Sequence, residues 1–339
     1  MAHEIELKLA LAECDQARFL RHPLLRTAAS RHVETLDNIY YDTPDLSLRR
    51  HGVALRLRRQ GRRWLQTVKL AGKEAAGLTS RPEWETPYCG HFDFTPIEVS
   101  AVREWLERPE LLACITPICE TRFRRITWHF PAGDGTVLLT LDRGWITADN
   151  HKEPISEIEM ELDGAPVSTI FAIARQLAQR VSLAPAVFSK AERGYRLHAG
   201  TPSAPLKANA VVIDRTLRPA SAFLTIASAC LHHLQQNYPG ALRCDDSAQP
   251  EYIHQMRFAL QRLCAAFSEF EPQCPPGLAQ RLAEFPQAAF ARLLVELDPT
   301  APQRTLQTLT APAYGQILLA AMGALHSLDE PDSRVVIKV

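Results

Sequence analysis

Charged and apolar residues alternate along two short segments of this chain. Glu4-Ile5-Glu6-Leu7-Lys8 puts two carboxylates and an ammonium on one face of an extended strand. Glu157, Glu159 and Glu161 put three carboxylates on one face of another strand. A solvated strand face would show the same alternation. However, like charges at this spacing repel, so we expect a fold to gather them where divalent cations are shared between them.

The residue types of this acidic set indicate which cation it would bind. Carboxylate oxygens without a histidine partner suit Mg²⁺ or Mn²⁺ rather than Zn²⁺. Asp142, at the end of the apolar segment 137–141, could join the glutamates. The sequence therefore favours a hard divalent metal site built from strands far apart in the chain.

Basic residues alternate in the same way. Arg56 and Arg58 share one face of a predicted strand, Lys69 ends the next strand, and Lys190 lies near Arg193 in a later segment. Arginine binds phosphate oxygens with two parallel hydrogen bonds, and lysine supplies a point charge. Any one of these could be a solvated cation or a surface ion pair. Their recurrence at period two beside the acids favours a closed sheet whose polar face points inward and binds cations and a polyanion together.

The overall charge excludes some functions. The 38 basic and 38 acidic residues cancel to a net charge of 0, although the arginines concentrate between Arg49 and Arg63 and the glutamates between Glu153 and Glu161. Separate blocks of opposite sign suggest a site that holds an anion together with cations. Broad nucleic-acid binding normally requires a net basic domain, so no nucleic-acid partner is expected.

No stretch of the sequence is predicted to enter or cross a membrane. The chain opens on charged residues rather than a signal peptide, and it contains no apolar run long enough for a spanning helix. The 8 cysteines include no Cys-x-x-Cys pair, which favours ordinary thiols. A cytoplasmic location and no membrane partner are the expectations.

The elements that must position these residues change character along the chain. Up to about residue 200, period-two alternation predicts strands at 4–11, 53–58, 64–70, 81–85, 137–141 and 155–162, with helices at about 14–25, 96–107 and 167–181. Turns are expected at Gly61 and at Gly133-Asp134-Gly135. Many antiparallel strands with short turns predict a barrel or a strongly curved sheet.

The second part of the chain is predicted to be helical. Proline, serine and glycine near residue 200 are typical of a linker. Helical periodicity follows at about 219–238, 250–270, 276–296 and 313–328. We therefore expect an α+β protein with a first domain at 1–200, a linker at 201–212 and an all-α domain at 213–339.

Six segments, in order, resemble the CYTH superfamily, also called the triphosphate tunnel metalloenzymes. They are Glu4-x-Glu6-x-Lys8, Tyr40-Tyr41-Asp42-Thr43-Pro44, Leu55-Arg56-Leu57-Arg58, Arg81-Pro82-Glu83, residues 156–162 and Ser189-Lys190. The nearest resemblance is to bacterial inorganic triphosphatases in which a CHAD domain follows the CYTH domain. The resemblance implies an eight-stranded antiparallel β-barrel, the triphosphate tunnel, followed by helices.

The same resemblance implies roles for individual residues. Metal ligands would be Glu4, Glu6, Asp142, Glu157, Glu159 and Glu161, and the triphosphate would be bound by Lys8, Arg56, Arg58, Lys69, Arg81, Arg125 and Lys190. The residues expected to act in catalysis are Glu4, Glu6, Lys8, Glu159 and Glu161. Arg125 is preferred to Arg122 and Arg124 by its distance from Trp128. Glu83 would lie behind the metal ligands or at one end of the substrate.

A second, partial resemblance lies in the helical part. His254, Arg257, Gln261 and Arg262 lie near one helical face and resemble a CHAD motif, which implies polyphosphate binding by His254, Arg257 and Arg262. Gln261 stands where that motif has a second cation, and residues 272–339 are poor in lysine and arginine. The helical domain could therefore be partial or mainly structural.

The function that follows is metal-dependent hydrolysis of inorganic triphosphate, with Mg²⁺ or Mn²⁺ and in-line attack of water. A second metal or a carboxylate could activate that water, and the sequence does not separate the two routes. Thiamine triphosphatase and class IV adenylate cyclase are alternatives with the same tunnel. A non-enzymatic polyphosphate-binding protein is an alternative of another class.

Overall fold

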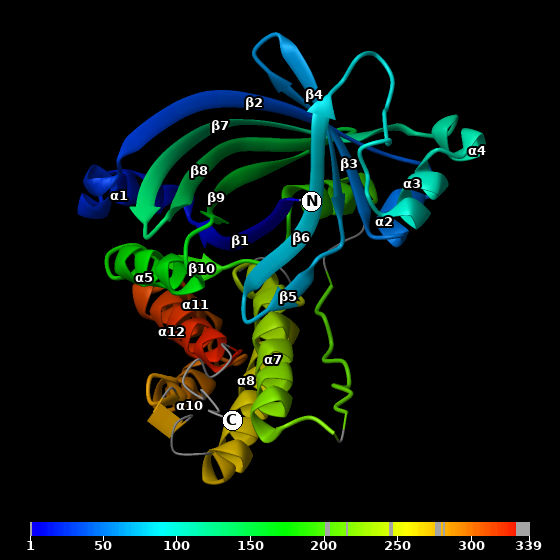
Figure 1. The fold of residues 1–339 in the computed structure, drawn as a ribbon. Helices are drawn as coiled ribbons and strands as arrows, with labels where there is room; N and C mark the ends of the chain where they lie inside the picture. The colour runs from blue at the N-terminus through cyan, green and yellow to red at the C-terminus, as the bar shows by residue number, and fades with distance from the viewer. Residues whose placement is uncertain are drawn as a thin grey trace, which may run out of the picture.

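Ten strands of the computed structural model form one sheet, and eight of them close into an antiparallel barrel (Figure 1). The structure describes residues 2–200, 204–214, 216–243, 247–274, 279–280 and 282–329. The barrel strands are β1 (Ala2–Leu11), β2 (Ser30–Asp42), β3 (Val53–Gln60), β4 (Arg63–Leu70), β6 (Leu78–Pro87), β7 (Thr116–Ala132), β8 (Gly135–Ala148) and β9 (His151–Asp163). Pairing of β1 with both β9 and β6 closes the ring, so the expected eight-stranded barrel is confirmed.

Strand alternation explains why the inside of this barrel is polar. Leu7, Leu9 and Leu11 of β1 are buried outside the wall, as are Ile158 and Met160 of β9. The residues that alternate with them along β1 and β9 point into the barrel, because successive side chains of a strand face opposite sides. The hydrophobic core therefore lies around the barrel wall, and the interior is left to charged side chains.

Two short strands lengthen the sheet beyond the ring. β10 (Leu183–Pro185) pairs with β1, and β5 (Lys73–Ala75) forms a hairpin with β6. The segment predicted as one helix at 14–25 is instead η1 (Glu13–Asp15), α1 (Gln16–Leu20) and η2 (Pro23–Thr27). Pro23 lacks the amide hydrogen that a continuing helix would need.

Five further helices belong to the barrel part of the chain. They are α2 (Ser47–Arg50), α3 (Ser100–Leu106), α4 (Pro109–Leu112), α5 (Val167–Ala178) and α6 (Lys190–His198). α5 carries the predicted apolar stripe, and its buried residues face β9 and α12. α6 packs against β7, β8 and β9.

The helical part contains α7 (Pro219–Ala241), α8 (Gln249–Phe270), η3 (Glu271–Gln273), α10 (Gln287–Glu296), α11 (Pro302–Thr310) and α12 (Pro312–Asp329). The helix predicted at 276–296 begins outside the described residues and is not continuous, because residues 283–286 are not helical. Pro286 precedes α10 at this break. The sequence pattern also does not predict α11, which is nine residues long and polar on most of its surface.

The two parts of the chain share one hydrophobic core. Figure 1 shows α5 lying between the barrel and α12, and α7 below the β5–β6 hairpin. Leu9, Ala174, Leu234 and Leu319 belong to the same buried cluster. Helix α12 also approaches β10 so closely that a Cβ atom on Gly315 would lie 1.6 Å from the carbonyl oxygen of Leu183.

Two features of the described residues concern membranes and thiols. Among them no single helix is both long and apolar enough to cross a bilayer; only the pair Pro302–Thr310 and Pro312–Leu328, bent by 61°, reaches that length and composition together. The cysteines within the described ranges are free thiols.

Candidate functional site

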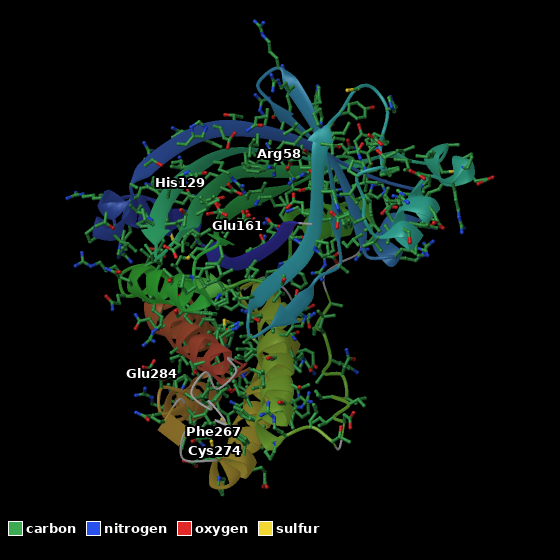
Figure 2. All side chains as sticks on the ribbon, in the orientation of Figure 1. Arg58, His129, Glu161, Phe267, Cys274 and Glu284 are labelled. Atoms are coloured by element: carbon green, nitrogen blue, oxygen red, sulfur yellow. The ribbon has the colours of Figure 1, made fainter. Side chains whose placement is uncertain are left out.

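A polar cavity of about 650 Å³ occupies the inside of the barrel. Eleven of the sequence-predicted site residues line it: Glu4, Glu6, Lys8, Arg56, Arg58, Lys69, Arg81, Arg125, Glu159, Glu161 and Lys190. Arg58 and Glu161 are labelled within the barrel in Figure 2. Asp142 and Glu157 are buried behind the cavity wall, with exposed fractions of 0% and 4%.

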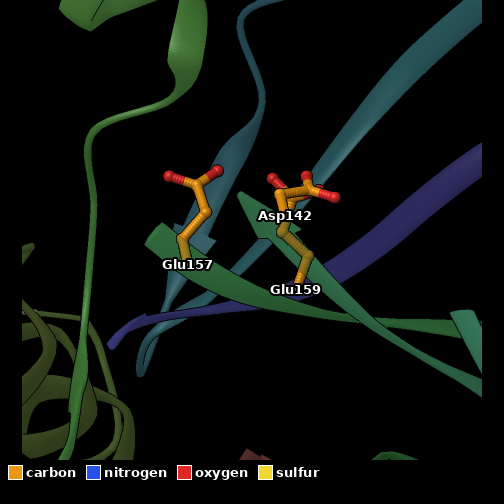
Figure 3. A group of neighbouring side chains, drawn as sticks. All are labelled: Asp142, Glu157 and Glu159. Atoms are coloured by element: carbon orange, nitrogen blue, oxygen red, sulfur yellow. The ribbon is translucent and has the colours of Figure 1, made fainter. Parts of the chain in front are cut away.

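Three predicted metal ligands form a tight carboxylate cluster. The oxygens of Asp142, Glu157 and Glu159 lie within 4.8 Å of one another (Figure 3). The ammonium of Lys190 is 2.6 Å from Asp142 Oδ2, 2.5 Å from Glu157 Oε1 and 3.0 Å from Glu159 Oε1. A lysine nitrogen therefore bonds to every member of the cluster and compensates the charge that a cation would otherwise balance.

Arg125 adds a second buried cation to this cluster. Its Nε and Nη2 atoms donate to the two oxygens of Asp142 at 2.8 and 2.6 Å, and Nη2 also donates to Glu159 at 2.7 Å. Burial alone would lower the pKa of Arg125, but Asp142 and Glu159 raise it well above its usual value. Arg122 is 79% exposed, so Arg125 is the inward residue of this pair.

A second group of ion pairs joins the strands that close the barrel. Lys69 Nζ lies 2.7 Å from Glu4 Oε2 and 3.0 Å from Glu83 Oε2. Arg81, directly opposite Glu4 in the β1–β6 register, binds both Glu4 and Glu6. Burial would raise the pKa of Glu4, but Lys69 and Arg81 outweigh it and lower the pKa to about 2.

Glu161 is the carboxylate that lacks such compensation. No hydrogen bond or ion pair to its side chain is found among the described residues. It lies opposite Glu6 in the β1–β9 register. Burial, with the charge of Glu4 adding to it, raises the pKa of Glu161 to about 7. A half-buried carboxylate without a cation partner among the described residues, beside further carboxylates, fits a hard divalent cation held by oxygen ligands.

The other imbalance is positive and lies on β3. Arg58 donates from Nε to Asn38 Oδ1 at 3.0 Å, and it has no carboxylate within ion-pair distance in the described part of the chain. Burial and the charges of Arg56 and Arg125 lower the pKa of Arg58 to about 10. Arg56 is only loosely paired, at 3.7 Å from Glu83 and 3.8 Å from Glu85. These guanidinium groups can take up an anion without first breaking a close ion pair.

Several lining residues are not singled out by the sequence pattern. Thr67, Glu85, Thr140, Tyr40 and Phe123 all face the cavity. Glu85 continues the alternation of Arg81 and Glu83 on β6, so period two alone could have identified it. The uncharged residues carry no such signal, because threonine and aromatic side chains occur on either face of a strand.

The predicted residues of the helical part are used differently from the barrel residues. Arg257 Nη1 donates to the carbonyl oxygens of Leu294 and Leu297, at 2.5 and 2.6 Å, where α10 ends. Arg262 Nη1 donates to Asn209 O at 3.4 Å. His254 and Arg257 line a recess of about 680 Å³ together with Phe258 and Val295, whose exposed fractions are 42% and 69%. The structure thus brings two of the three residues into one partly apolar recess, and Arg257 is already bound to backbone.

Two protein families and a curated protein match parts of this chain. Residues 2–195 match the CYTH domain family, and residues 225–289 match the CHAD domain. An inorganic triphosphatase of Haemophilus influenzae is 31% identical over 197 residues, which cover 58% of this chain and 55% of that protein. The chain therefore spans about half the length of this curated relative.

Two solved structures are similar to the first part of the chain. One is a putative adenylyl cyclase from Hippeastrum, described as having a dominant triphosphatase activity, with a TM-score of 0.39, 17% identity and coverage of 59% of this chain and 97% of that one. The other is a putative adenylate cyclase from Bacillus halodurans, with a TM-score of 0.37, 19% identity and coverage of 56% and 96%. Since the family match at residues 2–195 takes in more than half of the sequence, this chain belongs to the CYTH family and carries a CHAD-type segment after it.

Proposed function

We propose that this protein is a metal-dependent hydrolase of inorganic triphosphate. The observation that carries the proposal is one cavity with an unpaired carboxylate, Glu161, and weakly paired guanidinium groups, Arg56 and Arg58. A site that bound only a polyanion would gain nothing from an uncompensated acid. A polyphosphate that enters with a divalent cation satisfies both imbalances at once. The CYTH family and the relative described as an inorganic triphosphatase support this substrate.

The residues present fit Mg²⁺ or Mn²⁺, and we assign the metal to Glu4, Glu6 and Glu161. When bound there, such a metal would neutralise phosphate charge and lower the pKa of a water molecule. Asp142 we assign instead to Lys190 and Arg125, and Glu157 to Lys190, because neither carboxylate lines the cavity. Glu4 and Glu6 are paired with Lys69 and Arg81, but they line the cavity together with Glu161. Glu159 stays a predicted ligand as well as a partner of Lys8, at 2.6 Å.

The basic residues bind and orient the substrate. Arg56 and Arg58 receive phosphate oxygens first, because their own acidic partners are distant or absent among the described residues. Lys8, Lys69, Arg81, Arg125 and Lys190 add positive charge around the phosphate chain while they remain paired with buried carboxylates. Fixed donors aimed at the phosphate oxygens stabilise the charge of the transition state without reorganisation. Water then attacks a terminal phosphorus in line with the leaving phosphate, and a carboxylate of the cavity that does not hold the metal accepts its proton.

The remaining parts of the proposal concern the rest of the chain. We propose that residues 1–200 carry the activity and that residues 213–339 form a CHAD-like domain. Residues 201–212 would be the linker between them. Polyphosphate binding in the CHAD-like domain would use His254 and Arg262. Arg257 would contribute less, because it already donates to two backbone carbonyl oxygens. A cytoplasmic location is also part of this proposal.

Phosphate release by the purified full chain tests the function. With Mg²⁺ or Mn²⁺, release from triphosphate should exceed release from pyrophosphate, ATP and thiamine triphosphate, and Glu6→Ala should abolish it. Pyrophosphate formed from ATP would support the cyclase. Preference for thiamine triphosphate would support the thiamine enzyme. Tight binding of polyphosphate without any turnover would refute an enzymatic function.

A further inference from the structure

Helix α6 packs against β7, β8 and β9 and places its first residue, Lys190, in the cavity. Ser189 caps the helix, accepting a hydrogen bond from Glu192 N at 3.1 Å. Lys190 follows directly and is 6% exposed, with its ammonium among Asp142, Glu157 and Glu159. The position of this ammonium therefore depends on how α6 is held against the barrel.

Two sets of ion pairs hold α6 from opposite sides. On the β9 side, Arg193 lies 2.6 Å from Glu153 and 2.8 Å from Glu157. On the α2 side, Arg49 forks onto Glu192, with Nη2 at 2.8 Å from Oε1 and Nε at 3.3 Å from Oε2. The Arg49 guanidinium also lies 5.5 Å from the ring centre of Tyr195, one helical turn from Glu192. Arg49 thus contacts α6 through both charge and an aromatic face.

The base of this contact is rigid. Asp42, at the end of β2, is fully buried and accepts hydrogen bonds from the amides of Leu48 and Arg49 at 2.8 and 2.9 Å. The backbone of Arg49 is therefore fixed to the barrel wall, while its side chain reaches α6. Arg49 itself does not line the cavity.

We propose that Arg49 is a positioning residue that sets the place of Lys190 by binding Glu192. The proposal rests on the proposed function, because its effect is read through triphosphate binding. Without the Arg49–Glu192 contact, α6 keeps its packing on β7, β8 and β9 and the ion pairs of Arg193, but it loses its charged link to α2. Lys190 then moves relative to its three carboxylates, and the negative charge left at the cavity wall repels the phosphate chain. Since both side chains are about one-third exposed, at 36% and 30%, the contact adds little to global stability.

Steady-state kinetics of the full chain with Mg²⁺ tests this role. Arg49→Gln and Glu192→Gln should each raise KM for triphosphate about fivefold, while kcat changes less than about twofold. The double variant should raise KM by less than the product of the two single effects, since both substitutions remove the Arg49–Glu192 pair. Arg49 also lies over Tyr195 and Glu192 also pairs with Arg196 at 3.2 Å, so each single variant keeps a smaller effect of its own. Arg175→Gln, which removes the exposed pair with Glu284 at 3.1 Å, is the matched control and should leave KM unchanged.

Two further measurements show whether Arg49 acts through Lys190 and α6. In a Lys190→Met background, Arg49→Gln should have no additional effect on KM; a full fivefold effect there overturns the proposal. Amide hydrogen exchange of residues 190–198 should be faster in Arg49→Gln and Glu192→Gln than in wild type and Arg175→Gln. This exchange is measurable even if wild type hydrolyses no triphosphate. A wild type without triphosphate hydrolysis would defeat the proposed function alone, whereas unchanged hydrogen exchange in α6 would defeat the role of Arg49.

Discussion

The charged side chains inside the barrel divide into those that already have a partner and those that do not. Lys190, Arg125, Lys69 and Arg81 are bound to carboxylates at short distance. Among the described residues, Glu161 has no such cation and Arg58 donates to Asn38 rather than to a carboxylate, and the pKa of Glu161 is raised while that of Arg58 is lowered. We expect chemistry to depend most on the unpaired residues, because a bound metal or phosphate completes them.

Replacing Glu161 separates metal binding from stability. Glu161→Gln should reduce the metal-dependent rate at least about 100-fold, because a ligand oxygen with charge is lost. The metal-free variant should melt no lower than wild type, since an unpaired buried charge is removed. Initial rates of phosphate release and thermal melts in a chelator check both parts. A variant that keeps its rate would remove Glu161 from the metal site.

Replacing Arg58 tests the anion-binding side. Arg58→Ala should weaken triphosphate binding by about 1.5–3 kcal/mol, roughly 10- to 100-fold, because a hydrogen bond to a charged group is lost. Isothermal titration with triphosphate and a metal measures this change. Arg122→Ala, at a 79% exposed position on β7, which β2 separates from β3, is the control and should bind as wild type does. Equal losses in the two variants would indicate a diffuse charge effect rather than a contact.

At the scale of single elements, buried polar side chains fix short segments that have little stability of their own. Asp42 lies in the Tyr40-Tyr41-Asp42-Thr43-Pro44 segment on which the family resemblance partly rests. In the structure its oxygens accept from the amides of Thr43, Leu48 and Arg49. The four-residue helix α2 depends on this carboxylate, since so short a helix cannot form alone.

Asp42→Ala should therefore cost about 2–3 kcal/mol of unfolding free energy, because three backbone donors lose their acceptor. Urea denaturation measures the change. Asp37→Ala removes an acid whose ion pair with Arg122, at 3.4 Å, is largely exposed, and it should cost less than about 1 kcal/mol. If the two variants lose equal stability, the capping role of Asp42 is wrong.

The connection after the barrel is held by α7 and should respond to pH. His233 Nε2 is 2.8 Å from Leu206 O, and burial lowers the pKa of His233 although this hydrogen bond opposes the shift. The folded state favours the neutral form of His233. This histidine therefore makes its full contribution to stability at a pH above its pKa in the unfolded chain, near 6.5. That contribution is lost as the pH falls through the folded pKa.

Melting temperatures between pH 7.5 and 5 check this contribution. His233→Gln keeps a side-chain donor but cannot titrate, so its stability should fall less steeply with acid than that of wild type. Parallel pH profiles for the two proteins would show that His233 contributes nothing to acid sensitivity.

At the scale of the whole molecule, barrel and helices are joined by packing rather than by a single connection. Gly315 of α12 allows contact with β10, where a Cβ would meet the backbone oxygen of Leu183 at 1.6 Å. Gly323 of the same helix is different, since its Cβ would lie 3.5 Å from Phe171, an ordinary contact. Because β10 pairs with β1, α12 supports the strand that carries Glu4, Glu6 and Lys8.

Gly315→Ala should destabilise the protein by about 1–3 kcal/mol, because α12 must move away from β10. Gly323→Ala should be neutral or stabilising by up to about 1 kcal/mol, since alanine favours a helix. Calorimetry should show one unfolding transition for wild type, reflecting the shared core. Two well-separated transitions would instead support independent folding of the regions 1–200 and 213–339.

Alternation in the sequence predicted six of the eight barrel strands, without β2 and β7, together with the polar inner face. The reason is local: period-two alternation specifies which side chains share a strand face, and it does so without knowledge of the partner strand. The same reasoning placed Glu4, Glu6 and Lys8 on one face. The apolar stripe of α5 was equally readable, because helical periodicity is also local. The eight-stranded barrel and the roles of most lining residues were implied by the family resemblance.

Only the tertiary structure decided how the charges pair and how the two parts meet. Lys190 bonds to Asp142, Glu157 and Glu159, which lie 48, 33 and 31 residues earlier in the chain, because α6 packs back against the strands that carry them. Within the described residues, strand register leaves Glu161 opposite Glu6 and Arg58 beside the neutral Asn38 rather than a carboxylate. The break before α10, the presence of α11 and the core shared through α12 likewise depend on long-range packing, which no local pattern encodes.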